Sequence, residues 1–517
     1  MPETPRIAVV GAGAAGTLTA AQLLRRAAAL QAELEVWLID PGVTGRGVAY
    51  ASSAAHHLLN VPAGRMSAHH DAPDHFVRWL TRRAPGVHAG DDHVPRALYG
   101  EYLADVLAAA ASGPGPGRLH RVHERAVGVR RTDHGVTLVL GSDEPVPADA
   151  AVLALGNFPP GSGWAPPALH RSSRYLPAPW APGALECLPD HGDVLLVGTG
   201  LTMVDVALTL SRAGRAVRAI SRHGLLPQPH AESPLPVAPP PSFDSGADIQ
   251  QIRRSLLSHV SACRRTYGDW RVGIDSLRPV TAELWQHLSP SARAHFLHHD
   301  QALWNSHRHR IPPTIARALQ GEIDAGRIQV GPGEIADAAA TQDSVLVRLR
   351  DGRTLSVGAV VNCTGPQADV RRVDDPLVAG LLATGLAAPD PTGLGFHTTP
   401  NGRLLPADGT ASAVLWTLGS LRRGALFESA AIPEIRAQAH ALAADLLGSK
   451  NAGRRGGSPG LHMSLSPGPG VPVHNGPLHS SAFTLPSPAE HRSAVDEPPD
   501  GCPTAGRNVR PAVQPGA

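Results

Sequence analysis

The chain has 517 residues, 42% of them hydrophobic and 17% charged, which allows two or three domains with substantial cores. Its 46 basic and 44 acidic residues leave a net charge of +2, which excludes a broad basic surface for nucleic acid or an acidic membrane. The four cysteines form no C-x-x-C pair and no apolar run approaches the roughly 18 residues of a membrane span, so we expect a soluble cytoplasmic protein without a disulfide framework or a zinc knuckle.

Residues 6–40 have the pattern strand, glycine turn, helix, strand, with the turn written "GAGAAG". The full G-x-G-x-x-G follows an apolar strand and precedes a helix, and an acid closes the next strand, which is the context that dinucleotide binding requires. The helix N-terminus offers amide donors to a pyrophosphate, and the acid is placed to accept hydrogen bonds from a ribose. The predicted contacts to this nucleotide are Gly11, Gly13, Ala14, Ala15, Gly16 and Asp40.

A mixed region follows, up to about residue 165. The segments "DHFVRWL" and "ALYGEYLADVLAAAA" have helical spacing, and "AVGVRRTDHGVTLVLG" reads as two paired strands. The region closes with "AAVLALGN", whose continuous apolar run predicts a buried strand.

A second glycine turn stands in "DVLLVGTGLTMVDVALTL". Gly198 and Gly200 are present, but Met203 fills the third glycine position, so we expect the helix to lie slightly farther from its strand. The next strand ends in Ser221 and Arg222 instead of an acid. An acid would repel a 2′-phosphate, whereas these two residues are suited to bind one, so the turn favours NADPH over NADH. The alternative is that Arg222 is only a solvated charge.

The remaining chain contains a Pro-rich loop, a helix from Ile249 with Asp248 as its N-cap, and a hairpin turning at Asp351 and Gly352. A buried strand, "AVLWTLGS" and the helix "IPEIRAQAHALAADLL" end the predicted core. From residue 448 onward Gly, Pro, Ser and His dominate without apolar periodicity, so 448–517 is predicted to be a disordered tail.

Two turns imply two nucleotides, of which one is commonly FAD and the other the NAD(P)H that reduces it. We assign FAD to the complete first turn. The fold class is therefore α/β, with two Rossmann-like dinucleotide-binding domains. The predicted FAD domain comprises 1–165 and 355–447, and the inserted NAD(P)H domain comprises 190–350.

These motifs resemble the two-dinucleotide-binding flavoproteins. More narrowly, the chain resembles a bacterial FAD/NAD(P)-binding group that includes flavin-dependent urate hydroxylase and the aspartate N-monooxygenase that forms nitrosuccinate. The resemblance rests on both glycine turns and on "GRGVAYASSAAHHLLNVPAGRMSA", "VPRALYGEYL", "ISRHGLLPQPH", "WNSHRHRIPP", "VVNCTGP" and "TLGSLRRGALFESAAIPEIR". It covers most of residues 6–445 and is not specific to one substrate.

The resemblance implies further site residues. Gly45 and Gly47 would lie beside the FAD pyrophosphate or ribityl chain, and Gly419 beneath the flavin. Gly156 and Gly365 would mark the two crossings between domains. Asn60 resembles the asparagine that faces the flavin in N-hydroxylating and related monooxygenases; an ordinary turn residue before a proline is the alternative.

The reaction class is narrowed by what the chain lacks. Disulfide reductases need a cysteine pair beside the flavin, and this sequence has none. Dioxygen is the commonest other acceptor of electrons from reduced flavin. It forms a flavin hydroperoxide, which survives only when water is excluded and hydrogen bonds hold its proton. Asn60 is the candidate donor, and Arg65 the best-placed cation if its loop faces the flavin.

We therefore predict an FAD-dependent, NADPH-reduced monooxygenase that hydroxylates a small polar nitrogen-containing substrate, with dioxygen as cosubstrate. An NAD(P)H oxidase or dehydrogenase, and a redox-sensing flavoprotein without turnover, are the alternatives. The sequence predicts no nucleic-acid or membrane partner and is silent on oligomeric state.

Two other clusters have plainer interpretations. His295, His298 and His299 have helical spacing but no H-E-x-x-H motif, so we expect a solvated helix face and no metal site. In "RHRIPP", Arg308 and Arg310 would suit an anionic substrate, although we favour a surface location.

Overall fold

The computed structural model describes residues 4–244 and 246–454. The predicted tail from 455 to 517 lies outside the described residues, and helix α15 (Ile432–Arg454) continues past the predicted boundary at 447. No helix among the described residues is long and apolar enough to cross a membrane.

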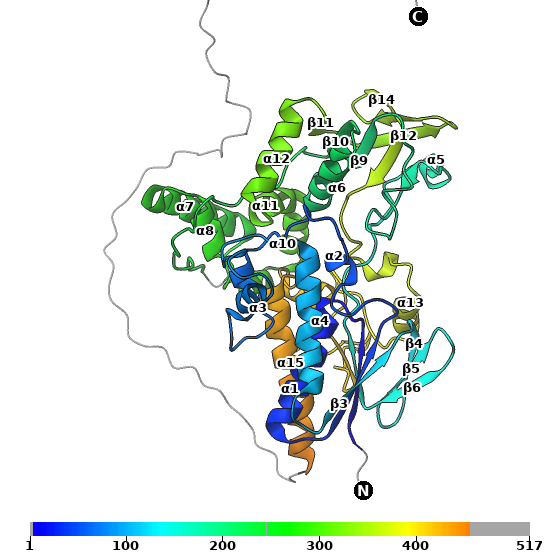
Figure 1. Cartoon of the computed structure of the whole chain (residues 1–517), viewed down its shortest axis with the longest axis vertical. Helices are drawn as coiled ribbons and strands as arrows, with labels where there is room; N and C mark the ends of the chain where they lie inside the picture. Colours follow the sequence, from blue (N-terminus) through cyan, green and yellow to red (C-terminus); the bar gives the residue numbers. More distant parts are fainter. Residues whose placement is uncertain (1–3, 245, 455–517) are drawn as a thin grey trace, which may run out of the picture. The chain divides into compact units, whose positions relative to one another are not determined.

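The first half of the fold is a parallel sheet whose strands run in the order β16-β7-β1-β2-β3. Its strands are largely apolar because both faces are covered, except for the edge strand β3, which is polar and only half-buried. Their bounds are β1 Arg6–Val10, β2 Leu34–Ile39, β3 Gly117–Val122, β7 Ala150–Leu153 and β16 Leu415–Thr417. Helices cover one face, and α1 contacts both α4 and α15 (Figure 1). These helices are α1 Ala14–Leu30, α4 Arg96–Ser112 and α15.

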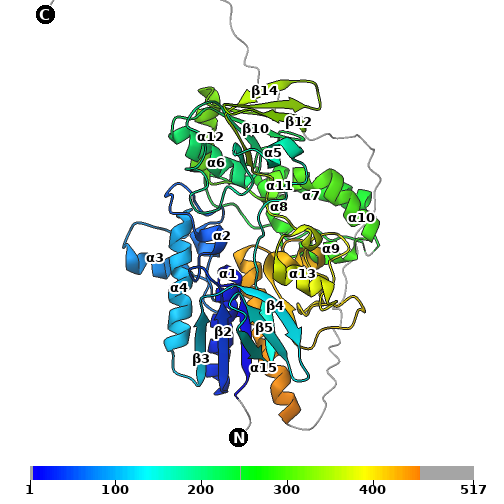
Figure 2. The same cartoon turned by 90° about the vertical axis from the view of Figure 1, so that its right-hand side faces the viewer.

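An antiparallel sheet and helix α13 (Pro376–Ala383) share a second hydrophobic cluster with the opposite face of the first sheet (Figure 2). The antiparallel strands are β4 Ala126–Arg131, β5 Val136–Leu140 and β6 Pro145–Ala148, as "AVGVRRTDHGVTLVLG" predicted for the first two. Short helices complete this half: α2 Gly47–Tyr50, α3 His75–Arg83 and α14 Arg423–Leu426, with 3-10 turns at Ala63–Arg65, Val370–Arg372 and Gly419–Arg422. The short helix α5 Pro167–His170 belongs instead to a hydrophobic cluster of the second half.

The second half repeats the design of the first. Its parallel sheet has the order β11-β10-β9-β15-β8. The strands are β8 Tyr175–Leu176, β9 Val194–Val197, β10 Val217–Ser221, β11 Ile328–Pro332 and β15 Ala359–Asn362. Helices α6 Leu201–Arg212 and α12 Pro313–Asp324 cover one face. An antiparallel sheet covers the other, built from β12 Ile335–Ala340, β13 Val345–Leu349 and β14 Thr354–Val357.

Between β10 and β11 the chain inserts a group of helices. They are α7 Ile249–Tyr267, α8 Arg271–Ser276, α9 Thr281–His287, α10 Pro290–His295 and α11 Gln301–Arg308, with a π-helical turn at Phe296–Asp300. The predicted N-cap of α7 is confirmed: the Asp248 side chain accepts a hydrogen bond from the amide of Gln251 in a full capping box.

The α/β fold class is confirmed, and the second sheet also contains strands that lie outside the predicted range 190–350. Strand β8 lies before residue 190 and pairs with β15, which lies after 350. By its place in the sequence β15 falls in the predicted range 355–447, where it is one more buried apolar run. Such a run carries no information about which sheet it joins, and only its pairing with β9 decides that.

Candidate functional site

The first glycine turn links β1 to α1 through close backbone contacts. Gly11 has φ +101°, and a Cβ there would lie 2.4 Å from the carbonyl oxygen of Ala154. A Cβ on Gly16 would lie 1.7 Å from the carbonyl oxygen of Gly11. Both positions therefore exclude any other residue. Gly13 is the N-cap of α1, and Ala14 and Ala15 are its first residues. The backbone amides of a helix's first turn have no partner within the helix and point toward the glycine turn.

Asp40 closes β2 beside this turn. One carboxylate oxygen accepts a hydrogen bond of 2.6 Å from the amide of Ala12, and the other accepts one of 2.6 Å from Gly42. A carboxylate has about four acceptor sites, so these two bonds orient Asp40 and still leave capacity for ribose hydroxyls. The geometry fits the role that the sequence predicted.

The "GRGVAY" loop closes over the turn. The Gly45 amide donates to the carbonyl of Ala12 at 2.8 Å, and a Cβ on Gly47 would lie 3.0 Å from the Cα of Gly13. A Cβ on Gly45 would lie 2.5 Å from the carbonyl of Gly100 in α4. The structure thus brings the predicted residues of both motifs together at the N-terminus of α1, and this cradle fits the pyrophosphate of FAD.

The second turn uses the same contacts. Gly198 has φ +110°, and a Cβ there would lie 2.3 Å from the carbonyl oxygen of Cys363, which follows β15 as Ala154 follows β7. Gly200 is the N-cap of α6, and no heavy atom lies within 4 Å of its Cβ position. Met203, at the third glycine position, is fully buried under the sheet. The two turns are equivalent parts of two equivalent sheets.

Ser221 and Arg222 differ in what they offer at the end of β10. The Ser221 hydroxyl lies 2.8 Å from the Thr199 hydroxyl and accepts a hydrogen bond of 3.0 Å from the Gly224 amide, so it shapes the loop. Arg222 is exposed, and its guanidinium makes no hydrogen bond or ion pair with any described residue. Of the two, Arg222 is the group available to a phosphate.

Asn60 and Arg65 lie on the loop before α3. The Asn60 carbonyl accepts a hydrogen bond of 2.8 Å from Nε2 of His230 in the second half. Its half-buried side chain makes no hydrogen bond within the described chain. Arg65 ends a 3-10 turn and is exposed. The structure brings Asn60 to the junction of the two halves and leaves Arg65 at the surface.

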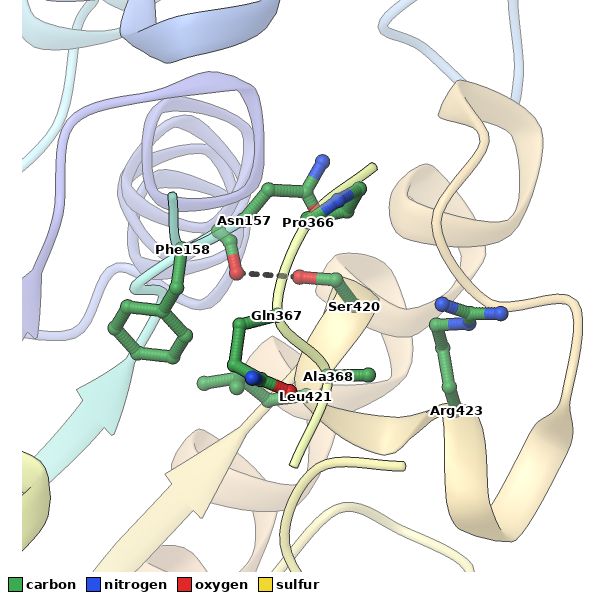
Figure 3. Close-up of a pocket in the computed structure, with 9 residues that line it drawn as sticks. Asn157, Phe158, Pro366, Gln367, Ala368, Ser420, Leu421 and Arg423 are labelled. Atoms are coloured by element: carbon green, nitrogen blue, oxygen red, sulfur yellow. Dashed lines mark hydrogen bonds between the residues drawn. The ribbon is translucent and has the colours of Figure 1, made fainter. Parts of the chain in front are cut away.

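One pocket is lined by residues from both crossings and by residues that follow Gly419, among them Asn157, Pro366 and Ser420 in Figure 3. The Ser420 hydroxyl donates to the carbonyl of Gly156 at 2.5 Å. Gly365 precedes the lining residue Pro366, and the Gly419 amide donates to the Gln438 side chain at 3.0 Å. The pocket is lined by Gly156, Asn157, Phe158, Pro366, Gln367, Ala368, Ser420, Leu421 and Arg423.

The surface interpretation of "RHRIPP" is wrong for Arg310, which is only 3% exposed. One guanidinium nitrogen pairs with Asp275, while Nε and Nη1 have no acceptor among the residues that the structure describes. Burial lowers the pKa of Arg310, and the Asp275 carboxylate opposes that shift. Burial also lowers the pKa of His230 to about 4, with a contribution from the Arg310 charge, so His230 is neutral where it donates to Asn60.

Sequence reasoning missed Arg96 and Asp205, which form an ion pair of 2.7 Å between α4 and α6. Their side chains are 19% and 8% exposed, so the pair is largely buried. Burial raises the pKa of Asp205, and the neighbouring Arg96 guanidinium opposes this. The quoted motif "VPRALYGEYL" contains Arg96, but nothing in its pattern indicates a partner 109 residues away.

The predicted absence of a metal site stays a prediction. His298 and His299 are exposed on the π-helical turn, as expected of a solvated face. Among the described residues no three His, Cys, Asp or Glu side chains are grouped so as to hold a metal ion.

Comparisons with known proteins agree with this geometry. Residues 8–158 match the model of the FAD-NAD(P)-binding family. A curated relative, an L-aspartate N-monooxygenase (nitrosuccinate-forming) from Streptomyces davaonensis, is 28% identical over 273 residues. That alignment covers 43% of this chain and 41% of the relative, so the chain matches about two fifths of the relative's length.

Solved structures share the fold. The ornithine hydroxylase of Pseudomonas aeruginosa has a TM-score of 0.57 at 15% identity, covering 86% of this chain and 99% of that one. The ornithine N-hydroxylase of Kutzneria sp. 744, in a structure named with reduced FAD, NADP+ and L-ornithine, has a TM-score of 0.57 at 14% identity, covering 87% and 100%. The L-lysine 6-monooxygenase of Pseudomonas syringae has a TM-score of 0.54 at 16% identity, covering 86% and 100%.

The family match falls on the first sheet and its glycine turn, and the structural matches extend over both sheets. The chain is therefore an α/β protein with two Rossmann-like sheets, and its residues 8–158 match the FAD-NAD(P)-binding family, as the resemblance of its sequence implied.

Proposed function

We propose that the protein is an FAD-dependent monooxygenase, reduced by NADPH, that hydroxylates a nitrogen atom of a small polar substrate with dioxygen. The observation that carries this proposal is the pair of equivalent glycine turns, with Gly11 and Gly198 in the same contact with the next strand. A chain with two such turns and no cysteine pair is suited to pass hydride from one nucleotide to the other and then to dioxygen. The N-hydroxylating relatives support the choice of nitrogen.

The residues have distinct parts in this proposal. Bound FAD would accept hydride and would supply the chemistry that activates dioxygen. The first turn and Asp40 hold its pyrophosphate and ribose, and the second turn with Arg222 holds NADPH. Asn60 lies at the junction of the two halves, and its side-chain amide has no acceptor among the described residues. This amide is therefore suited to hold a proton or an oxygen atom in place.

Arg310 favours a substrate with an acidic group. A buried guanidinium with two nitrogens that lack an acceptor among the described residues binds carboxylates strongly because charge-assisted bonds replace its lost hydration. Arg310 lies near His230, which holds the Asn60 loop. An amino acid or a related zwitterion fits this chemistry.

The test is substrate-stimulated NADPH oxidation across small amines and amino acids, with hydroxylated product and hydrogen peroxide measured together. Product in proportion to NADPH consumed is expected for at least one substrate. Peroxide alone with every substrate, or transfer to a quinone, would establish the oxidase or dehydrogenase alternative. Purified protein that binds FAD and NADPH without turnover would establish the redox-sensing alternative.

Replacing Asn60 by Ala is expected to leave NADPH-driven flavin reduction within about twofold of wild type, because hydride transfer does not need its amide. Loss of one hydrogen bond worth about 1–3 kcal/mol should instead divert oxygen to peroxide. We expect the ratio of product to NADPH to fall several-fold.

Asn60→Asp provides the matched control for this variant. An ionised carboxylate accepts but cannot donate, so it should uncouple the reaction as Ala does. Wild-type coupling in both variants would show that Asn60 is only a turn residue.

A further inference from the structure

The Arg96–Asp205 pair joins the elements that carry the two glycine turns. Arg96 is the first residue of α4, and Asp205 lies in the second turn of α6. Three groups of Arg96 are engaged: its amide donates to the carbonyl of His57 at 2.9 Å, its Nε donates to that of Leu58 at 3.0 Å, and Nη2 pairs with Asp205. Arg96 thus holds the loop that leads to Asn60 and the NADPH-side helix at once.

Continuous tight contacts connect this pair to both turns. On the FAD side, α4 meets the "GRGVAY" loop where the carbonyl of Gly100 closely approaches Gly45, whose amide binds the carbonyl of Ala12 in the first turn. On the NADPH side, Asp205 is five residues beyond Gly200, within the same helix. No stretch of flexible chain separates the first turn from the second along this route.

A neutral hydrogen-bonded cluster flanks the ion pair. Thr209, one turn beyond Asp205 on α6, donates to the Asp205 carbonyl at 2.8 Å. Its oxygen then accepts from Nε2 of His56 and from Nε2 of His57, both at 2.9 Å. Nδ1 of His57 is left to accept from the Ser52 hydroxyl at 2.5 Å. Burial lowers the pKa of both histidines to about 4, which agrees with these neutral forms.

We infer that Arg96 and Asp205 are positioning residues that set the distance and angle between the two bound nucleotides. Hydride transfer needs the donor and acceptor carbons in near contact, so a small rotation of α6 relative to α4 lowers its rate steeply. The ion pair acts together with the two hydrogen bonds from Arg96 to the carbonyls of His57 and Leu58, so one guanidinium ties α6 to the loop before Asn60. Removing one partner would leave a largely buried charge uncompensated. The inference rests on the proposed assignment of FAD and NADPH to the two turns.

The test compares Asp205→Asn, Arg96→Met and the double variant Arg96→Met/Asp205→Leu with wild type. The limiting rate of flavin reduction by NADPH is measured by anaerobic stopped flow. FAD occupancy and the reoxidation of dithionite-reduced enzyme are measured beside it. Each single variant is expected to reduce flavin at least tenfold more slowly, with reoxidation within twofold of wild type. The double variant should regain thermal stability, because no charge is left unpaired, and should stay slow.

Arg403→Gln is the matched control. Arg403 pairs with Asp445 at 3.2 Å with both side chains 25% exposed, and this pair lies wholly within the first half. The Arg403→Gln substitution should lower the melting temperature without slowing flavin reduction. A double variant with wild-type reduction rate would overturn the inference, because the pair would then only avoid a buried unpaired charge.

Hydrogen exchange supplies a readout that needs no coenzyme. In Asp205→Asn, amides of residues 57–60 and of α6 should exchange at least tenfold faster, while those of β1 and β2 stay unchanged. Unchanged exchange at 57–60 and in α6 would contradict the inference even if NADPH proved not to be the coenzyme. Failure of wild type to be reduced by NADPH would instead refute the proposed function and leave the exchange test standing.

Discussion

Replacing Gly13 by Val is expected to yield protein without FAD, whereas Gly200→Val should keep its FAD and lose reduction by NADPH. The two glycines are the N-caps of α1 and α6, with φ of −68° and −84°, so neither backbone excludes a side chain. A Cβ on Gly13 would lie 3.6 Å from the Cα of Gly47, and one on Gly200 would meet no atom within 4 Å. The fold should therefore tolerate both changes.

The expected losses come from the ligands. A valine side chain at either position stands where the backbone must approach a pyrophosphate, and a penalty of about 3 kcal/mol would lower affinity more than hundredfold. Flavin absorbance after gel filtration measures FAD occupancy, and anaerobic reduction measures the second site. Each variant serves as the control for the other. Normal FAD content in Gly13→Val, or loss of FAD in Gly200→Val, would reverse or refute the assignment of the turns.

Replacing Arg222 by Ala is expected to weaken the preference for NADPH over NADH. The wild-type enzyme should prefer NADPH because the exposed guanidinium that follows β10 has no partner in the described part of the chain and is available to the 2′-phosphate. Loss of one charge-assisted contact should raise the apparent dissociation constant for NADPH roughly ten- to hundredfold, with little effect on NADH. Flavin reduction measured against the concentration of each coenzyme gives both values.

Arg218 provides the control for this substitution. It lies on the same strand but pairs with Asp193 at 2.8 Å, away from the strand's carboxyl end. Arg218→Ala removes an equal charge and should leave coenzyme preference unchanged. Equal kinetics with both coenzymes in the wild-type protein would remove the basis for the phosphate site.

Local features of the sequence were sufficient for the two turns. A glycine turn between an apolar strand and a helix is specified within about 30 residues, because strand, turn and helix are contiguous and each glycine answers a backbone constraint. Gly11 and Gly198 have the positive φ that such turns require, and Asp248 caps its helix as predicted. The α/β class followed from the same contiguous patterns.

Contacts between distant segments were decided by the tertiary structure alone. Strand β8 has two residues and too little pattern to be recognised, and β15 joins the second sheet only through its pairing with β9. The charge of Arg310 in "RHRIPP" favours an exposed position, yet Arg310 is buried. The inserted helices enclose it, and its guanidinium forms an ion pair with Asp275. The Arg96–Asp205 pair depends on how α4 and α6 meet. Periodicity and turn chemistry act over a few residues, whereas burial and ion pairing depend on which surfaces the whole chain brings together.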